Sequence, residues 1–310
     1  MMRRRTDHAF QDTPPRRSVE YRVQNGVIVL NKSPGPTSHQ ATSYLKDILG
    51  IDKAGHGGTL DPNVTGVLPV ALQEKTKLTH AILGSPKEYV GLLYLHGDVS
   101  DRELYECFGD YTGVIEQLPP VKSAVKREVR EREIYSLDVL SREGHSVLVR
   151  VGCEGGTYIR KLFHDIGEDL GVNAHMQELH RTKAGPFTTE DMYTLHEVKD
   201  FHAFWEQGRG DWFDDVVLEP EEAVSHLPKI IVHDSTKKSL SHGAYLKVPG
   251  IVACDTDIEV GDKVAVLSQG YELLLIGVAE MRSRDLLRAD RGVAVNTSQV
   301  YFLPKHLDKV

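Results

Sequence analysis

The chain has 310 residues, 40% of them hydrophobic and 26% charged, with a formal net charge of −8 at pH 7. This length allows two domains with substantial cores, and the composition is ordinary for a globular protein. No run of residues approaches the roughly 18 apolar positions of a membrane span, no secretory signal is visible, and Cys107, Cys153 and Cys254 form neither a zinc spacing nor a disulfide framework, so we expect a cytoplasmic protein that does not contact a membrane.

The first part of the chain indicates an α+β domain. Residues 1–25 are polar and aperiodic, which predicts a tail, or a strand that orders only against another part of the protein. A helix is predicted from the apolar spacing between Ala41 and Leu49, with Thr37 or Ser38 as its cap and Gly50 as its end. Strands are predicted at 26–31, 67–72, 88–96 and 145–153, and further helices near 74–83 and 157–170. These elements follow no βαβ rhythm, so we expect a mixed, mainly antiparallel sheet over residues 26–205.

The remaining chain divides into a connector and a small β domain. Nine acidic and two basic residues lie between positions 197 and 222, and the predicted acidic connector covers 206–228. Beyond it, short strands separated by turns predict a β-barrel over 229–304. Basic residues cluster instead in the N-terminal tail and at Lys122, Lys126, Arg127, Arg130 and Arg132. Such clusters can neutralise the phosphates of a nucleic acid locally, or can simply be solvated surface.

Asp61 is the leading candidate for chemistry. It lies in the glycine-rich stretch GHGGTLDPNVTG (55–66), just before a predicted buried strand. Pro62 disfavours a helical conformation at Asp61, and the glycines allow backbone or ligand to approach closely. A short acid held on a stiff loop suits a nucleophile or a general base, although Asp61 could also only cap an Asp-Pro-Asn turn.

Arg160 is a candidate partner for this acid. It falls in the first turn of a predicted helix, where the helix dipole disfavours a cation by about 0.3–1 kcal/mol. A carboxylate partner would explain this placement, and the alternative is a side chain that reaches solvent. Tyr89 can be a core aromatic or a platform on which a base stacks. No second or third metal ligand accompanies His56 at a metal-binding spacing, and no phosphate-binding loop is present, so neither a metal nor a cofactor is predicted.

Four ordered motifs resemble the TruB/dyskerin family of pseudouridine synthases. They are GHGGTLDPNVTGVLPVAL (55–72), KEY (87–89), GTYIRKLFHDIG (156–167) and AHMQELHRTKAGPF (174–187). The C-terminal part, with VPG at 248–250 and VGD at 260–262, resembles a PUA RNA-binding domain. The Gly57-Gly58 form of the loop, the acidic connector and this domain resemble the archaeal, guide-RNA-dependent branch of the family.

The resemblance implies an enzyme that isomerises uridine to pseudouridine in RNA without a cofactor. Asp61 would attack a flipped nucleotide, Tyr89 would stack on its uracil, and Arg160 would pair with the aspartate inside a dry pocket. Further positions expected to bind the substrate are His56, Tyr158, Leu179 and Lys32. The sequence departs from the family pattern at Ser33, where proline is usual, and at His180, where arginine is common, which puts one phosphate contact in doubt.

The resemblance also implies partners. They are a box H/ACA guide RNA, small ribonucleoprotein subunits and ribosomal RNA, although action on the TΨC-loop uridine of tRNA without a guide is equally compatible with the sequence. The main rival interpretation is a non-catalytic RNA-binding scaffold, which would not need the set of Asp61, Tyr89 and Arg160. A second rival is a metal-dependent hydrolase that uses His56 and Asp61.

Overall fold

The computed structural model describes residues 2–4, 6, 8–119 and 126–302. The chain forms two compact units, one of residues 28–216 and one that combines residues 1–27 with 217–310. Both contain a large sheet with helices, so the expected α+β class with mixed, mainly antiparallel sheets is confirmed.

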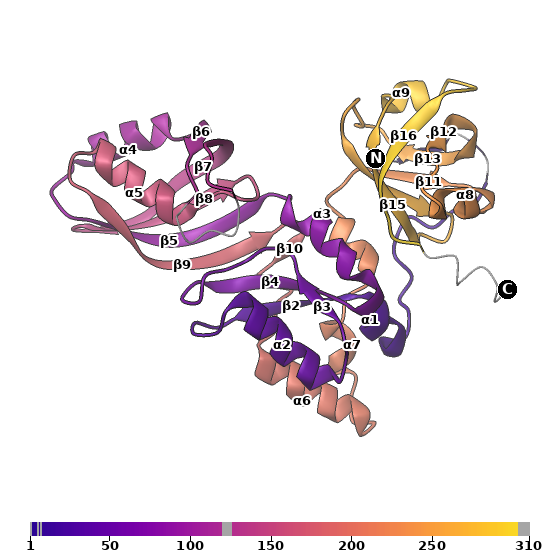
Figure 1. The fold of residues 1–310 in the computed structure, drawn as a ribbon, viewed down its shortest axis with the longest axis horizontal. Coiled ribbons are helices and arrows are strands. Elements are labelled where there is room, and N and C mark those ends of the chain that lie inside the picture. Colours follow the sequence, from indigo (N-terminus) through magenta and orange to yellow (C-terminus); the bar gives the residue numbers. More distant parts are fainter. Residues whose placement is uncertain (1, 5, 7, 120–125, 303–310) are drawn as a thin grey trace. The chain divides into compact units, whose positions relative to one another are not determined.

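A nine-stranded sheet organises the unit of residues 28–216, in the order β2-β4-β9-β5-β8-β7-β6, with β3 on β4 and β10 on β9 (Figure 1). The strands are β2 (Val27–Lys32), β3 (Ala54–His56), β4 (Thr65–Leu72), β5 (Lys87–Leu95), β6 (Gly113–Gln117), β7 (Arg130–Glu143), β8 (Ser146–Cys153), β9 (Ala174–Ala184) and β10 (Phe187–Thr188). The central strand β5 pairs antiparallel with β8 and β9, whereas β4 and β9 run parallel. The expected strands therefore exist as β2, β4, β5 and β8, and β3, β6, β7, β9 and β10 add to them.

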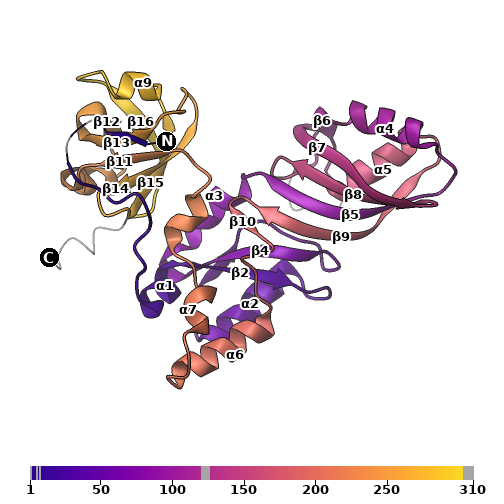
Figure 2. The same ribbon diagram turned by 180° about the vertical axis from the view of Figure 1, so that it is seen from behind.

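Helices cover this sheet in two groups. They are α2 (Ser38–Leu49), the 3-10 turn η1 (Gln73–Leu78), α3 (Thr79–Leu83), α4 (Asp101–Asp110), α5 (Ile159–Asp169), α6 (Leu195–Glu206) and α7 (Trp212–Val216). In Figures 1 and 2, α4 and α5 lie together over the β5–β8 part, and α2 lies beside α6.

Local signals explain where α2 begins and ends. Thr37 forms a capping box with Gln40, and Gly50 ends the helix with φ 62°, as expected from the sequence. The prediction of a single helix near 74–83 is wrong, because Lys75 has non-helical dihedral angles and the segment divides into η1 and α3.

The second unit is built on a seven-stranded sheet in the order β1-β13-β11-β14-β15-β16-β12. Its strands are β1 (Met2–Arg4), β11 (Lys229–Val232), β12 (Leu246–Lys247), β13 (Ile251–Asp255), β14 (Lys263–Ser268), β15 (Leu273–Ala279) and β16 (Val293–Val300). Its helices are α1 (Val19–Asn25), η2 (Pro220–Val224), η3 (Asp234–Thr236), α8 (Lys237–Ser241), η4 (Val248–Gly250) and α9 (Ser283–Leu286). The N-terminal strand β1 pairs with β13, so the start of the chain completes this sheet.

Part of the charge noted in the sequence is structural. Within the acidic connector, Glu219 and Glu221 are buried, and Arg17 Nη1 lies 2.6 Å and 2.8 Å from their carboxylate oxygens. In the basic cluster, Glu128 forms ion pairs with both Lys126 and Arg130. Lys122 and residues 303–304 of the expected barrel lie outside the described residues.

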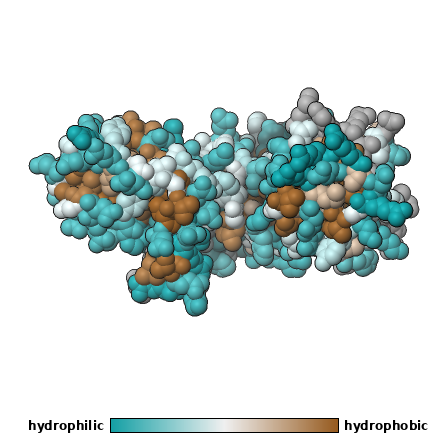
Figure 3. All heavy atoms as spheres, turned by 90° about the horizontal axis from the view of Figure 1, so that it is seen from above, coloured by the Kyte–Doolittle hydropathy of each residue, from teal (hydrophilic) through white to brown (hydrophobic). Residues whose placement is uncertain are grey.

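No helix among the described residues is both long and apolar enough to cross a membrane. On the face shown in Figure 3, hydrophobic residues form separate patches within a mainly hydrophilic surface.

Gly66 is a position where the fold requires glycine. It has φ +102°, and a Cβ atom there would lie 2.3 Å from the carbonyl oxygen of Arg181 on β9. We expect Gly66→Ala to destabilise the protein by more than about 3 kcal/mol, because backbone strain and a backbone clash add. Gly144→Ala is the matched control, since Gly144 also has a positive φ of 58° but has no atom within 4 Å of the added carbon. Urea denaturation followed by circular dichroism measures both, and equal losses would contradict the clash.

Candidate active site

Asp61 lies at the tip of a tight turn between β3 and β4. Leu60 and Val64 on either side are buried, whereas Asp61, Pro62 and Asn63 are exposed. The amide of Val64 donates a hydrogen bond to the carbonyl oxygen of Asp61 at 3.0 Å, which closes the turn. The acid is therefore presented outward by a turn whose two ends are anchored in the core.

Two buried polar side chains hold this turn. Ser38 Oγ at the start of α2 accepts a hydrogen bond from Leu60 N (2.8 Å) and donates one to Leu60 O (2.9 Å). Lys32 Nζ donates to the carbonyl oxygens of Pro62 and Val64, each at 2.9 Å, and of Ser33 at 3.0 Å. Lys32 is only 2% exposed, so its ammonium group fixes the loop that carries Asp61. This placement favours a role in holding the loop over direct contact with RNA.

Arg160 forms an ion pair with Asp61, through Nη2 and Oδ2. The arginine comes from the first turn of α5, whose start is held by Gln117: its side chain accepts a hydrogen bond from Tyr158 N (3.0 Å) and donates one to Tyr158 O (3.2 Å). The structure thus brings together the acid and the arginine that the helix-dipole argument suggested as partners.

The expected dry pocket around this pair is absent from the described protein. The side chains of Arg160 and Asp61 are 57% and 53% exposed, because the acid occupies the tip of its turn and the arginine reaches it from the outer part of α5. The ion pair is therefore solvated in the free chain.

Tyr89 and Arg181 form a buried pair beside the Asp61 loop. Tyr89 on β5 is 8% exposed and Arg181 on β9 is 1% exposed. Burial raises the pKa of Tyr89, while the positive charge of Arg181 on the neighbouring strand acts in the opposite direction. Arg181 also donates from Nε to Val67 O (2.7 Å) and from Nη2 to Gly58 O (3.2 Å).

Arg181 was not among the residues singled out from the sequence. No local signal marked it, because the alternation along β9 is interrupted, and Leu179 and Arg181 share a buried side only once the strand is paired with its neighbours. A basic residue at a buried position of a strand requires partners, and here they belong to the candidate site.

His56 and Lys87 are two further titratable residues near Arg181 and the Asp61 loop. Burial lowers the pKa of His56 on β3, and the positive charges of Arg181 and His39 lower it further, so the ring is neutral near pH 7. Its buried Nδ1 has no hydrogen-bond partner among the described residues. Burial also lowers the pKa of Lys87 to about 7, and its Nζ donates to Ile82 O and Ser85 O at 2.7 Å and 2.6 Å.

The remaining expected substrate-binding residues occupy different environments. Leu179 is 8% exposed, and a Cβ at Gly91 would lie 2.9 Å from both the Leu179 side chain and Phe163, which places Leu179 in the core under α5. Tyr158 is half-buried at the N-cap of α5. His180 Nδ1 forms a 2.8 Å hydrogen bond with Thr65 Oγ1, so this departure from the family pattern contacts the start of β4.

Possible metal ligands gather elsewhere. Among the described residues, the one group of three with ligand atoms within 4.8 Å of one another is His164, Asp165 and Glu168 on α5. Lys161 forms an ion pair with Asp165 in this group. Neither His56 nor Asp61 belongs to such a group within the described ranges.

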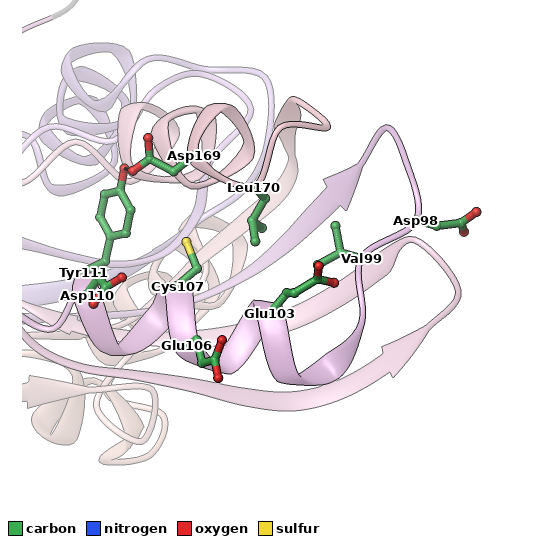
Figure 4. Close-up of a pocket in the computed structure, with 9 residues that line it drawn as sticks. All are labelled: Asp98, Val99, Glu103, Glu106, Cys107, Asp110, Tyr111, Asp169 and Leu170. Atoms are coloured by element: carbon green, nitrogen blue, oxygen red, sulfur yellow. Dashed lines mark hydrogen bonds between the residues drawn. The ribbon is translucent and has the colours of Figure 1, made fainter.

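A pocket of about 290 Å³ lies between α4 and α5 (Figure 4). Tyr111 and Asp169 point toward each other there and form a 2.7 Å hydrogen bond. Five of the nine lining residues are acidic, which makes the pocket unsuitable for RNA phosphates.

Three family models match the chain in succession. They are the N-terminal domain of TruB family pseudouridylate synthase at residues 46–159, the tRNA pseudouridylate synthase B C-terminal domain at 160–225, and the PUA domain at 228–301.

Curated relatives match almost end to end. A probable tRNA pseudouridine synthase B of Methanopyrus kandleri is 48% identical over 96% of this chain and 89% of its own length. A protein of the same description from Pyrococcus furiosus is 47% identical over 94% of this chain and 86% of its own length.

Solved structures agree in fold and sequence. A chain of a Cbf5-Nop10-Gar1 complex matches with a TM-score of 0.90 and 44% identity, over 98% of this chain and 95% of that one. A chain of an H/ACA ribonucleoprotein bound to a substrate RNA containing 2′-deoxyuridine matches with a TM-score of 0.87 and 42% identity, over 97% and 94%. With these matches along nearly its whole length, the chain belongs to the TruB family of pseudouridine synthases.

Proposed function

We propose that this chain is the catalytic subunit of an H/ACA-type ribonucleoprotein and isomerises uridine in RNA, with Asp61 as its nucleophile. The observation that carries the proposal is the ion pair between Asp61 and Arg160 on a loop that Lys32 and Ser38 hold. A carboxylate fixed in this way is ionised, directed outward and ready to meet a nucleotide that has left its stack.

The reaction exchanges one glycosidic bond for another. The bond from the ribose to the uracil nitrogen breaks, a bond to the uracil C5 carbon forms, C5 loses a proton and the nitrogen gains one, so neither oxidant nor imported group is required. Asp61 assists detachment of the base, Arg160 stabilises the charged acid, and Tyr89 stacks on the uracil. His56, Tyr158 and Leu179 are proposed to border the base, and Lys32 to hold the loop.

The exposure of the ion pair in the free chain is compatible with a reaction that takes place in a water-excluded site. In the free chain the pair is solvated, and the RNA itself excludes water when the flipped base enters. Without water around it, an unpaired aspartate would favour its protonated form. The stabilisation that Arg160 gives to the charged Asp61 carboxylate therefore increases when RNA binds.

The first prediction concerns Asp61. Asp61→Asn keeps the size of the side chain and removes its charge, so we expect activity to fall by about a thousand-fold or more while RNA binding persists. Tritium release from RNA labelled at uridine C5 measures activity, and filter binding measures affinity. Asp52→Asn, at an exposed acid just before β3, is the control and should be fully active. Turnover by Asp61→Asn would exclude Asp61 as the nucleophile, and an inactive wild-type protein would favour a scaffold.

The second prediction separates catalysis from stability at Arg160. Because the ion pair is more than half exposed, Arg160→Ala should change the free energy of unfolding by less than about 1 kcal/mol. Under bound RNA the same change leaves a covered carboxylate unpaired, which costs about 3–5 kcal/mol and lowers kcat by about 10²–10⁴-fold. Arg160→Lys should recover part of this loss.

The control for this pair is Arg102→Ala, which removes an equally simple exposed ion pair, with Glu106 on α4. It should affect neither stability nor turnover. If Arg160→Ala turned over RNA at the normal rate, the pairing would have no part in the reaction.

The ribonucleoprotein assignment rests on the solved relatives, which are described as complexes with Nop10 and Gar1 or with substrate RNA. The curated relatives are described as probable tRNA pseudouridine synthases, which makes guide-independent action on tRNA the second candidate. We further propose that residues 26–205 carry out catalysis, that 206–228 connect the domains, that 229–304 bind RNA as a PUA domain, and that the protein works in the cytoplasm, where its three free cysteines stay reduced.

The third prediction distinguishes the two substrates. The purified chain is incubated with ribosomal RNA and with tRNA, each with and without a box H/ACA guide RNA and the small partner proteins, and pseudouridines are mapped. We expect ribosomal RNA to be modified only when the guide and the partners are present. Equal modification of the TΨC-loop uridine by the chain alone would favour the tRNA enzyme.

A further inference from the structure

We propose that Gln117 is a positioning residue of the active site, which fixes the first turn of α5 and thereby holds Arg160 against Asp61. The inference rests on the proposed function, and it concerns a residue that acts through another one. In this role Gln117 contacts the backbone of α5 and not the substrate.

The start of α5 lacks the usual local caps. Tyr158 occupies the N-cap position, and its side chain makes no capping hydrogen bond. In a capping box, a Glu or Gln three positions later accepts a hydrogen bond from the N-cap amide. That position is Lys161, whose ammonium group cannot accept and forms an ion pair with Asp165 instead. Arg160 and Lys161 also place two cations at the positive end of the helix dipole, so the first turn needs support from another element.

Gln117 supplies this support from a distant strand. It lies at the end of β6, 41 positions before Tyr158 in the chain, and is only 2% exposed. Its Oε1 accepts a hydrogen bond from Tyr158 N at 3.0 Å, and its Nε2 donates one to Tyr158 O at 3.2 Å. The same carbonyl oxygen accepts from Leu162 N at 3.0 Å, which closes the first turn of the helix. One side-chain amide therefore fixes both polar backbone groups of the residue from which α5 starts.

The later part of α5 is held by other contacts. A Cβ atom at Gly167 would lie 2.2 Å from Ala174 N, so the helix packs directly on the backbone at the start of β9. The Arg160 side chain has no comparable packing, because it is 57% exposed where it meets Asp61. Loss of the Gln117 amide should therefore loosen the turn that carries Arg160 more than it loosens the helix as a whole.

A double-mutant cycle tests the inference. Single-turnover rates with excess enzyme and the Kd for RNA are measured for wild type, Gln117→Met, Arg160→Ala and the double variant. We expect Gln117→Met to lower the rate by about tenfold or more with Kd nearly unchanged, because a misplaced Arg160 supports the nucleophile poorly. Once Arg160 is absent, the same change should have no more than about a two-fold effect. Equal losses in both backgrounds, or a loss confined to Kd, would overturn the inference.

Two further variants separate positioning from general stability. Gln117→Glu keeps the size of the side chain and the acceptor for Tyr158 N, but its carboxylate cannot donate to Tyr158 O, so its rate should lie between those of wild type and Gln117→Met. Ser100→Ala is the matched control, because it removes the N-cap of α4, the helix beside α5. It should lower Tm but leave the rate unchanged. A rate loss in Ser100→Ala equal to that in Gln117→Met would reduce Gln117 to a stabilising residue.

A second readout does not depend on turnover. Nitrogen-15 NMR follows the side-chain signal of Arg160, and Asp61→Asn supplies the reference signal of the arginine without its partner. We expect Gln117→Met to move the signal toward this reference, whereas Ser100→Ala should leave it in place. An unmoved signal in Gln117→Met would overturn the inference even if the variant were slow. A moved signal in a protein whose wild type is inactive would support the positioning role and leave only the proposed function in error.

Discussion

The structure depends on how a solvent-exposed turn is held still. Asp61 is useful only if its carboxylate stays where the RNA can meet it, yet the tip of a turn is normally the most mobile part of a loop. Two buried side chains hold the turn, because Ser38 bonds to the backbone just before Asp61 and Lys32 bonds to the backbone just after it. The backbone around Asp61 is thereby anchored to the core while the Asp61 side chain stays exposed. Arg160 can therefore reach the carboxylate from a separate helix.

Buried cations give the site its electrostatic character. Lys32 and Arg181 are each at most 2% exposed, and the hydrogen bonds described for them go to backbone carbonyls. Their charges are therefore not cancelled by neighbouring carboxylates. Much of the negative charge belongs to other parts of the sequence, namely the acidic connector and the residues that line the pocket between α4 and α5. A chain with a net charge of −8 can in this way present a locally positive site to RNA.

The sequence predicts local structure here better than long-range structure. Thr37 and Gly50 bound α2 as expected, because caps are local signals. The strands β7 and β9 were not predicted, since their exposed and buried positions lack a strict alternation and their pairing depends on distant partners. The same limit applies to the site. The helix dipole pointed to a partner for Arg160, whereas the burial of Arg181 follows only from the register of β9 against β4 and β5.

In the proposed site, an exposed acid and a buried supporting layer have different tasks. The loop backbone and the start of α5 are held by buried or part-buried hydrogen bonds. Everything that must become dry is left exposed at Asp61 and Arg160. If the proposed reaction takes place here, a flipped base displaces water from Asp61 and Arg160 on entry, and the site reaches low polarity only while the base is present. Water exclusion then becomes part of substrate recognition, and the unoccupied enzyme avoids the cost of keeping an ion pair buried.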